Sequence, residues 1–196
     1  MATQIADASD NFSDGLIKPL LPRLLHDFPE VTWPIIGEAI VRDRKEAWRM
    51  EIVLAGDFGF QGKRPVILDL PEDSLFAWLH AHPDVAPAFA VGMLPVLTSR
   101  DPNDDSRTIH PCMRRLLNEF GQRDDVLKAL THNMHAFGWM GSVATYFALY
   151  ERPLQELKSH PIGAVRRWAQ ATETRLREVI KSIHTEEDER NANWEL

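Results

Sequence analysis

The chain has 196 residues, of which 44% are hydrophobic and six are tryptophan, so it can bury a core as one globular domain or a short repeat array. Its 22 Lys and Arg stand against 29 Asp and Glu, and the net charge of −7 argues against a protein that coats nucleic acid. The single cysteine, Cys112, excludes a disulfide framework and a multi-cysteine metal site. The apolar runs are shorter than a membrane span and residues 1–10 are too polar for a signal peptide, so we expect a soluble, cytoplasmic protein.

The first helices are predicted from apolar residues that recur every three or four positions. Residues 13–28 have this spacing, and Pro19 and Pro22 within them predict a short or kinked helix. The next apolar stripe begins at Trp33. We expect Pro34 to occupy the first turn of that helix, because the missing N–H of proline is not needed there.

The middle of the chain alternates between helices and irregular segments. A helix is expected over residues 43–54, followed by a loop-rich patch near residues 56–70 in which residues 66–68 form buried extended chain. Another helix is expected to end near His82, and a further one to run from Pro83 as far as Leu97.

The second half is the more regular part of the sequence. The polar residues 99–107 predict a loop. Four helical segments are expected after it, over residues 111–120, 124–137, 142–157 and 161–183. The last of them has an apolar face that includes Trp168 and an opposite polar face that includes Glu173 and Arg177, which form an i,i+4 pair.

Three His-Pro pairs, at His82, His110 and His160, each precede a predicted helix. Proline suits the first helical position, and a ring nitrogen of the preceding histidine can accept a hydrogen bond from a free backbone N–H. The spacings between the pairs are unequal, which indicates an irregular array rather than a clean repeat. The sequence therefore predicts an all-α fold of about eight helices, stacked as irregular HEAT-like pairs.

A family resemblance rests on residues after position 110. His160-Pro-Ile-Gly-Ala-Val-Arg-Arg-Trp-Ala169 resembles the start of a HEAT-type repeat helix. Phe120-Gly-Gln-Arg-Asp-Asp-Val-Leu127, with residues 133–134, 137–142 and 146, resembles the helical C-terminal region of large bacterial NTPases and other effectors of anti-phage defence. The resemblance covers roughly residues 66–196 and implies a non-catalytic sensing or interaction role. The motif residues to which it assigns structural roles are His110, Gly121, Asp124, Asn133, Trp139, His160 and Trp168.

Domain organisation is predicted from the composition of the two ends. We expect a polar N-terminal tail over residues 1–12, a single helical-repeat domain over residues 13–184 and an acidic C-terminal tail over residues 185–196. The run Glu186-Glu187-Asp188-Glu189 is expected to follow the last helix as a frayed segment. Such an acidic segment can also dock to a basic partner.

Catalytic and metal chemistry find weak support in the sequence. His132 and His135 would share one helical face, but no third ligand is identified, and packing or surface roles are favoured. Cys112 lies two residues after His110, and burial as a small apolar side chain is favoured over reactivity. Residues 138–142 contain two glycines but lack the lysine of a phosphate-binding loop. We therefore expect no catalytic site, no metal and no cofactor.

The preferred functional hypothesis is a non-catalytic helical scaffold that binds a protein partner, such as a larger effector or NTPase, as a sensor or accessory part of a bacterial defence system. The alternative is a HEAT-like protein that binds or processes nucleic acid through the face from Arg166 to Lys181, where each cation would neutralise a phosphate. Trp139 and Trp168 could be cited for a glycosylase of this class, but core packing is favoured for both. The candidate contacts for either partner are Arg114, Arg115, Arg166, Arg167, Arg177 and Lys181.

Overall fold

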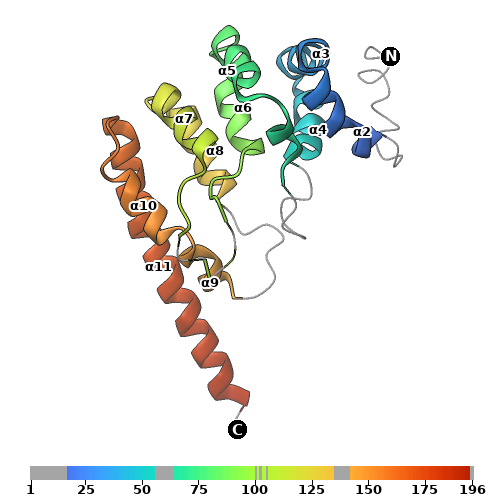
Figure 1. The fold of residues 1–196 in the computed structure, drawn as a ribbon. Coiled ribbons are helices and arrows are strands. Elements are labelled where there is room, and N and C mark those ends of the chain that lie inside the picture. The colour runs from blue at the N-terminus through green and yellow to red at the C-terminus, as the bar shows by residue number, and fades with distance from the viewer. Residues whose placement is uncertain are drawn as a thin grey trace. The chain divides into compact units, whose positions relative to one another are not determined.

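The computed structural model describes residues 17–55, 64–99, 101, 103–104, 106–134 and 142–194. These ranges are helical and contain no β-strand, which confirms the expected all-α fold. The chain divides into two compact units, Met1–Pro95 and Val96–Leu196. Figure 1 shows the helices of each unit, and the units are treated separately below.

The first unit consists of consecutive short helices joined by tight connections. In chain order they are α2 (Ile17–Asp27), α3 (Pro29–Arg42), α4 (Arg44–Ala55), the 3-10 helix η1 (Val66–Asp69), α5 (Glu72–Ala81) and α6 (Ala86–Met93). Helix α4 packs against α3, α6 and η1, while α2 packs against α3 and η1. The apolar stripes of these helices meet inside the unit, where Leu25, Leu54 and Leu79 are fully buried.

Two tryptophans form the centre of the contact between α3 and α5. The rings of Trp33 and Trp78 meet edge to face with their centroids 5.1 Å apart, a geometry that aromatic pairs prefer. Gly37, one turn after Trp33, allows this approach, because a Cβ at Gly37 would lie 2.6 Å from Nε1 of Trp78. The lack of a side chain at Gly37 therefore sets how closely α3 and α5 pack.

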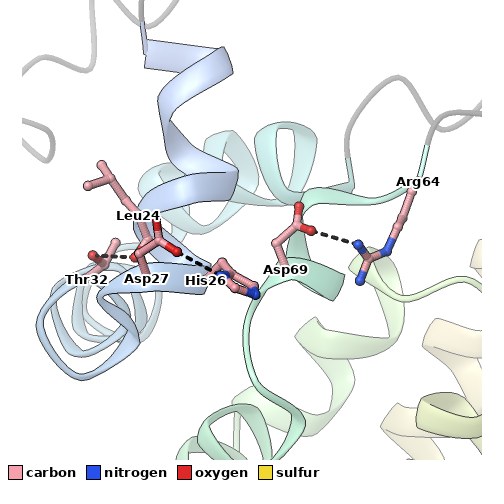
Figure 2. A network of polar contacts seen from close by, with 6 residues as sticks. All are labelled: Leu24, His26, Asp27, Thr32, Arg64 and Asp69. Carbon is pink, nitrogen blue, oxygen red and sulfur yellow. Dashed lines mark hydrogen bonds and ion pairs between the residues drawn. The ribbon is translucent and has the colours of Figure 1, made fainter.

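Polar contacts join α3 to α2 and connect η1 to the residues that precede it (Figure 2). The Thr32 hydroxyl, in the first turn of α3, donates to the carbonyl oxygen of Leu24 in α2 over 3.2 Å. The Arg64 guanidinium donates to the Asp69 carboxylate over 2.8 Å, which connects the two ends of η1. Such an exposed ion pair contributes at most about 1 kcal/mol, so burial of the apolar faces remains the main source of stability.

The short helix expected around Pro22 is confirmed as α2, and the helix expected over residues 43–54 is confirmed as α4. The prediction for Pro34 is wrong, because α3 begins at Pro29 and Pro34 lies inside the helix. The prediction of extended chain at residues 66–68 is also wrong. This segment is 3-10 helix, with a Leu70 N–H to Ile67 carbonyl bond that closes its last turn.

The helix expected from Pro83 to Leu97 is shorter than predicted. It begins at Ala86, after a turn in which the His82 carbonyl accepts hydrogen bonds from the N–H groups of Val85 and Ala86. It ends at Met93, and Leu97 instead forms an isolated antiparallel bridge with Ile109. The apolar spacing at Leu97 therefore reflects burial rather than helix.

The second unit is organised around its long last helix. In chain order its helices are α7 (Pro111–Phe120), α8 (Asp124–Asn133), α9 (Val143–Ala148), α10 (Glu151–Leu157) and α11 (Gly163–Trp194). Helix α11 packs against α8, α9 and α10. The described part of the loop expected over residues 99–107 is non-helical, and the His110 N–H to Val96 carbonyl bond of 2.9 Å closes its base.

Three predictions in this unit require correction. The helix expected over residues 124–137 is shorter, because α8 ends at Asn133 and Met134 lies in a turn. Residues 142–157 form two helices rather than one, because Pro153 lacks the N–H that would bond the carbonyl of Leu149 and its ring would clash with that carbonyl. Helix α11 begins at Gly163 and continues to Trp194, so the acidic residues 186–189 lie within the helix rather than after it. Figure 1 shows α11 as one continuous helix.

Candidate interaction surfaces

Two of the three His-Pro pairs place histidine at the start of a helix as a cap. Nδ1 of His110 accepts from the N–H of Cys112 over 3.3 Å, and Nδ1 of His160 accepts from the N–H of Ile162 over 3.2 Å. The predicted capping by a ring nitrogen is thus confirmed for α7 and for the turn that leads into α11. His82 differs, because it lies at the end of α5 with its ring 6.1 Å from that of Trp78.

The cap at His160 is buried beside two guanidinium groups. The residue is only 6% exposed, and its Nε2 has no hydrogen-bond partner among the described residues. Burial lowers the pKa of His160 below its usual 6.5, and the charges of Arg114 and Arg166 lower it further. Since the neutral ring is the form that can accept a hydrogen bond at Nδ1, the low pKa keeps the cap in place near neutral pH.

Three other described motif residues lie at the ends of helices. Gly121 ends α7, where a Cβ would lie 2.6 Å from a methyl group of Val165 in α11. Asp124 begins α8 and Asn133 ends it. Trp139 lies outside the described residues, as does His135, the expected partner of His132. Across the described ranges, no group of three or more His, Cys, Asp and Glu side chains could hold a metal ion, and Cys112 is buried.

Most of the six predicted contact cations are already bound to other groups of the chain. Arg166 donates to the carbonyl oxygens of His160 and Pro161 over 2.7 and 2.8 Å. Three others hold ion pairs, namely Arg114 with Glu156 (2.8 Å), Arg115 with Glu119 (2.9 Å) and Arg177 with Glu173 (2.5 Å). Arg167 and Lys181 have no ion pair among the residues that the structure describes.

Glu173 occupies a position that the helical pattern did not predict. The residue is only 6% exposed, because its carboxylate accepts hydrogen bonds from Gln155 in α10 and from Lys158, whose Nζ is 2.7 Å away. The Lys158 hydrogen bond is the largest cause that holds the pKa of Glu173 below its usual value, and the Arg177 charge adds to it. Glu173 therefore links α11 to the C-terminal end of α10 through these contacts, and its side chain is buried rather than exposed to solvent.

A hollow between α8 and α11 is lined by three of the predicted residues, Asp124, Arg167 and Trp168. Its volume is about 350 Å³, and we call it the α8–α11 hollow. The residues that line it are Asp124, Leu127, Lys128, Thr131, Ala164, Arg167 and Trp168.

One wall of the α8–α11 hollow is the indole of Trp168, whose place depends on Thr131. The Thr131 hydroxyl donates to the carbonyl of Leu127 over 3.0 Å and accepts from Nε1 of Trp168 over 2.9 Å. The indole is partly exposed, so the expectation that Trp168 is a core residue is only half met. An indole whose N–H is already bonded within the protein, and which lines a hollow, is suited to apolar contact with a ligand.

Three charged side chains line the α8–α11 hollow. Lys128 and Asp124 belong to α8, and Arg167 belongs to α11. None of the three has a hydrogen-bonded or ionic partner among the described side chains. Sequence reasoning identified Arg167 and missed Lys128, since nothing in the spacing along α8 shows that it faces α11.

A second surface lies on α4 in the first unit. Trp48 and Ile52 are 63% and 52% exposed, whereas Met50 and Leu54 on the inner face of the same helix are buried. Because residues four apart lie on the same side of a helix, Trp48 and Ile52 form one apolar ridge, here called the α4 ridge. Sequence analysis predicted this helix and missed the ridge, although Trp48, which lies off the side that carries Met50 and Leu54, was the available signal.

The N-terminal end of the α4 ridge is basic. Arg44 and Lys45 precede Trp48 by four and three residues, are exposed, and hold no ion pair within the described part of the chain. Arg49 is already neutralised by Glu46 at 3.1 Å. The α4 ridge thus offers apolar contact area together with free positive charge.

Comparisons with known proteins find no match to this chain among protein-family models, curated proteins or solved structures. No helix within the described ranges is both long and apolar enough to cross a membrane.

Proposed function

We propose that this chain is a non-catalytic helical interaction module that binds a protein partner in the cytoplasm. The observation that carries the proposal is the α4 ridge, where Trp48 and Ile52 are more than half exposed on a helix whose other face is buried. Aromatic side chains are enriched in protein interfaces, and a large exposed one is typical of an energetic anchor. The fitting partner presents apolar side chains flanked by carboxylates that can pair with Arg44 and Lys45.

The architecture proposed for this module is an irregular stack of HEAT-like helix pairs. Its support is the packing of successive helices on each other, as in α3 with α4, α5 with α6, and α10 with α11. From the resemblance of residues 120–127, with residues 133–134, 137–142 and 146, to a helical region of bacterial defence proteins, we further propose that the partner is a larger effector or NTPase. The module would then act as its sensor or accessory part.

Nucleic-acid binding is the competing hypothesis, and the contacts of the predicted cations favour it less. Three of the six form ion pairs with carboxylates of this chain, and Arg166 is bound to backbone carbonyls. A cation that already has a carboxylate partner releases fewer counterions when it meets a phosphate. Protein binding therefore remains the preferred proposal.

The test is retention of partner proteins by the tagged full-length chain and by the double variant Trp48→Ala/Ile52→Ala. Both side chains are exposed, so the double variant should keep its helical circular dichroism and its Tm, since surface changes usually alter stability by less than about 0.5 kcal/mol each. We expect it to lose the proteins that the unmodified chain retains. The matched control is Val143→Ala, an exposed apolar residue in the other unit, which should retain them. Equal retention by all three chains would overturn the assignment of the α4 ridge.

A further inference from the structure

The α8–α11 hollow combines groups that the α4 ridge proposal does not use. It has an indole wall from Trp168 and two cations, Lys128 and Arg167, on two different helices. Its volume of about 350 Å³ is at the lower end of the range for small-ligand sites and suits one or two side chains rather than a whole ligand of drug size.

The charges of the α8–α11 hollow determine what can bind there. Lys128 and Arg167 have no carboxylate partner among the described residues, so their charge is available to a bound anion. A guanidinium pairs with a carboxylate in a planar, two-point geometry, and an ammonium adds a point charge. The Nε1–H of Trp168 is already used by Thr131, so the indole offers its apolar surface to a ligand.

We propose that the α8–α11 hollow binds an acidic peptide segment of a protein. One carboxylate lies between Lys128 and Arg167, and a neighbouring apolar side chain packs on Trp168. This inference concerns a different unit from the α4 ridge and stands without it.

A peptide carboxylate fits the site better than a nucleic-acid strand does. The site offers two cations without an ionic partner among the described residues, and Asp124, which also lines it, would repel a second and third phosphate of a strand. The neighbouring Arg123 is neutralised by Asp125 at 2.7 Å, so it does not extend the positive area. The chain as a whole carries a net charge of −7, which also disfavours a polyanion.

The experiment follows the indole N–H resonance of Trp168 by ¹H–¹⁵N NMR in the full chain, with the resonance assigned from Trp168→Phe. The probe is the peptide acetyl-Glu-Leu-Glu-amide, and its neutral counterpart is acetyl-Gln-Leu-Gln-amide. We expect a saturable shift with the acidic peptide in the millimolar range, weakened by added salt, and no saturable shift with the neutral one. The proposal is overturned if the acidic peptide leaves the resonance unmoved, or if both peptides shift it equally.

Variants that remove single charges at the hollow should weaken or strengthen peptide binding according to the sign of the charge. Lys128→Gln and Arg167→Gln should each weaken binding of the acidic peptide by about two- to fivefold, the range for an exposed ion pair. Asp124→Asn should strengthen binding, because it removes the negative charge that lines the hollow. Arg175→Gln, an exposed cation on α11 outside the hollow, is the control and should leave binding unchanged. Equal effects of Arg175→Gln and Arg167→Gln would mean that the peptide is attracted by the overall charge of the chain rather than bound in the hollow, and would contradict the proposed site.

A single-stranded oligonucleotide provides the comparison with nucleic acid. A shift of the Trp168 resonance caused by the oligonucleotide and not by the peptide would assign the hollow to nucleic acid instead.

Discussion

The indole N–H of Trp168 in α11 donates a 2.9 Å hydrogen bond to the hydroxyl of Thr131 in α8. The two residues are far apart in the sequence, and their bond fixes the orientation of a ring that is partly exposed at the α8–α11 hollow. The same hydroxyl donates to the Leu127 carbonyl, so its donor and one acceptor position are both used. A tryptophan held at its polar edge in this way presents a preorganised apolar face.

Trp168→Phe and Thr131→Val should each lower the free energy of unfolding by about 1 kcal/mol through loss of this hydrogen bond, with packing changes in addition. The double variant should lose less than the sum, with a coupling of about 0.5–1.5 kcal/mol, since the bond can be lost only once. Urea denaturation of the unmodified chain, the two single variants and the double variant measures this coupling. Strictly additive losses would mean that the bond does not contribute in solution. Trp168→Ala should cost less than the about 3–5 kcal/mol expected for a fully buried tryptophan.

His160 predicts a stability change near neutral pH. Its folded pKa lies below 6.5, the usual histidine value, so the unfolded chain binds the proton more readily. The stability from the neutral ring is complete above pH 6.5 and declines as the pH falls from there toward the folded pKa. His160→Asn keeps a good capping side chain and removes this titration. The unmodified chain should therefore lose Tm relative to His160→Asn as the pH drops below 6.5. His26→Asn, which removes an exposed histidine that caps no helix, is the control, and parallel pH profiles for the unmodified chain and His160→Asn would contradict the assignment.

Gly121→Ala should destabilise the chain by about 1–3 kcal/mol, the usual cost of overpacking. A Cβ there would lie 2.3 Å from the backbone carbonyl oxygen of Leu117 and 2.6 Å from a methyl group of Val165, a buried residue of α11. Gly163→Ala is the matched change, because a Cβ at that position would be 3.4 Å from the flexible end of Arg167. It should be neutral or slightly stabilising, since alanine restricts the unfolded chain. Thermal unfolding of both variants provides the comparison, and an equal effect would refute the packing argument.

Glu173→Gln should lower the Tm at neutral pH, because it replaces the carboxylate that accepts from Lys158 and pairs with Arg177. The pKa of Glu173 is lowered in the folded state, so its stabilising effect is present above its usual value of 4.5 and is lost as the pH falls below it. The Tm difference between the two chains should therefore shrink in acid. Glu178→Gln, an exposed change on the same helix, should leave the Tm unchanged. A constant Tm difference at all pH values would attribute the effect of Glu173→Gln to packing alone.

Local signals in the sequence predicted several elements well. Both ends of α7 match the expected residues 111–120, because His110-Pro111 starts the helix and Gly121 follows its last residue. The capping role of His110 and His160 also followed from local chemistry, since the accepting ring lies only two residues from the donor N–H. Interactions of this kind depend on residues that are close in the sequence.

Contacts between distant residues account for the incorrect predictions about individual side chains. Glu173 fits the polar side of α11 by spacing, and it is buried because Gln155 and Lys158 of another segment meet it there. The indole of Trp168 fits the apolar face by spacing, yet it is partly exposed and lines a hollow between α11 and α8. The six candidate contact cations were chosen by composition, and the structure shows that most of them already have partners within the chain. The position of Trp48 off the apolar side of α4 was a signal for the α4 ridge, whereas the place of Lys128 at the hollow could not be recognised without knowing which helix faces are covered.

The most direct test of the central claim is purification of the tagged full-length chain from the cells that naturally express it, with protein and nucleic acid quantified in the same eluate. The account predicts a protein partner in stoichiometric amount, little nucleic acid, and loss of that partner from the Trp48→Ala/Ile52→Ala variant. Nucleic acid that co-purifies without a protein partner and washes off with added salt would contradict it.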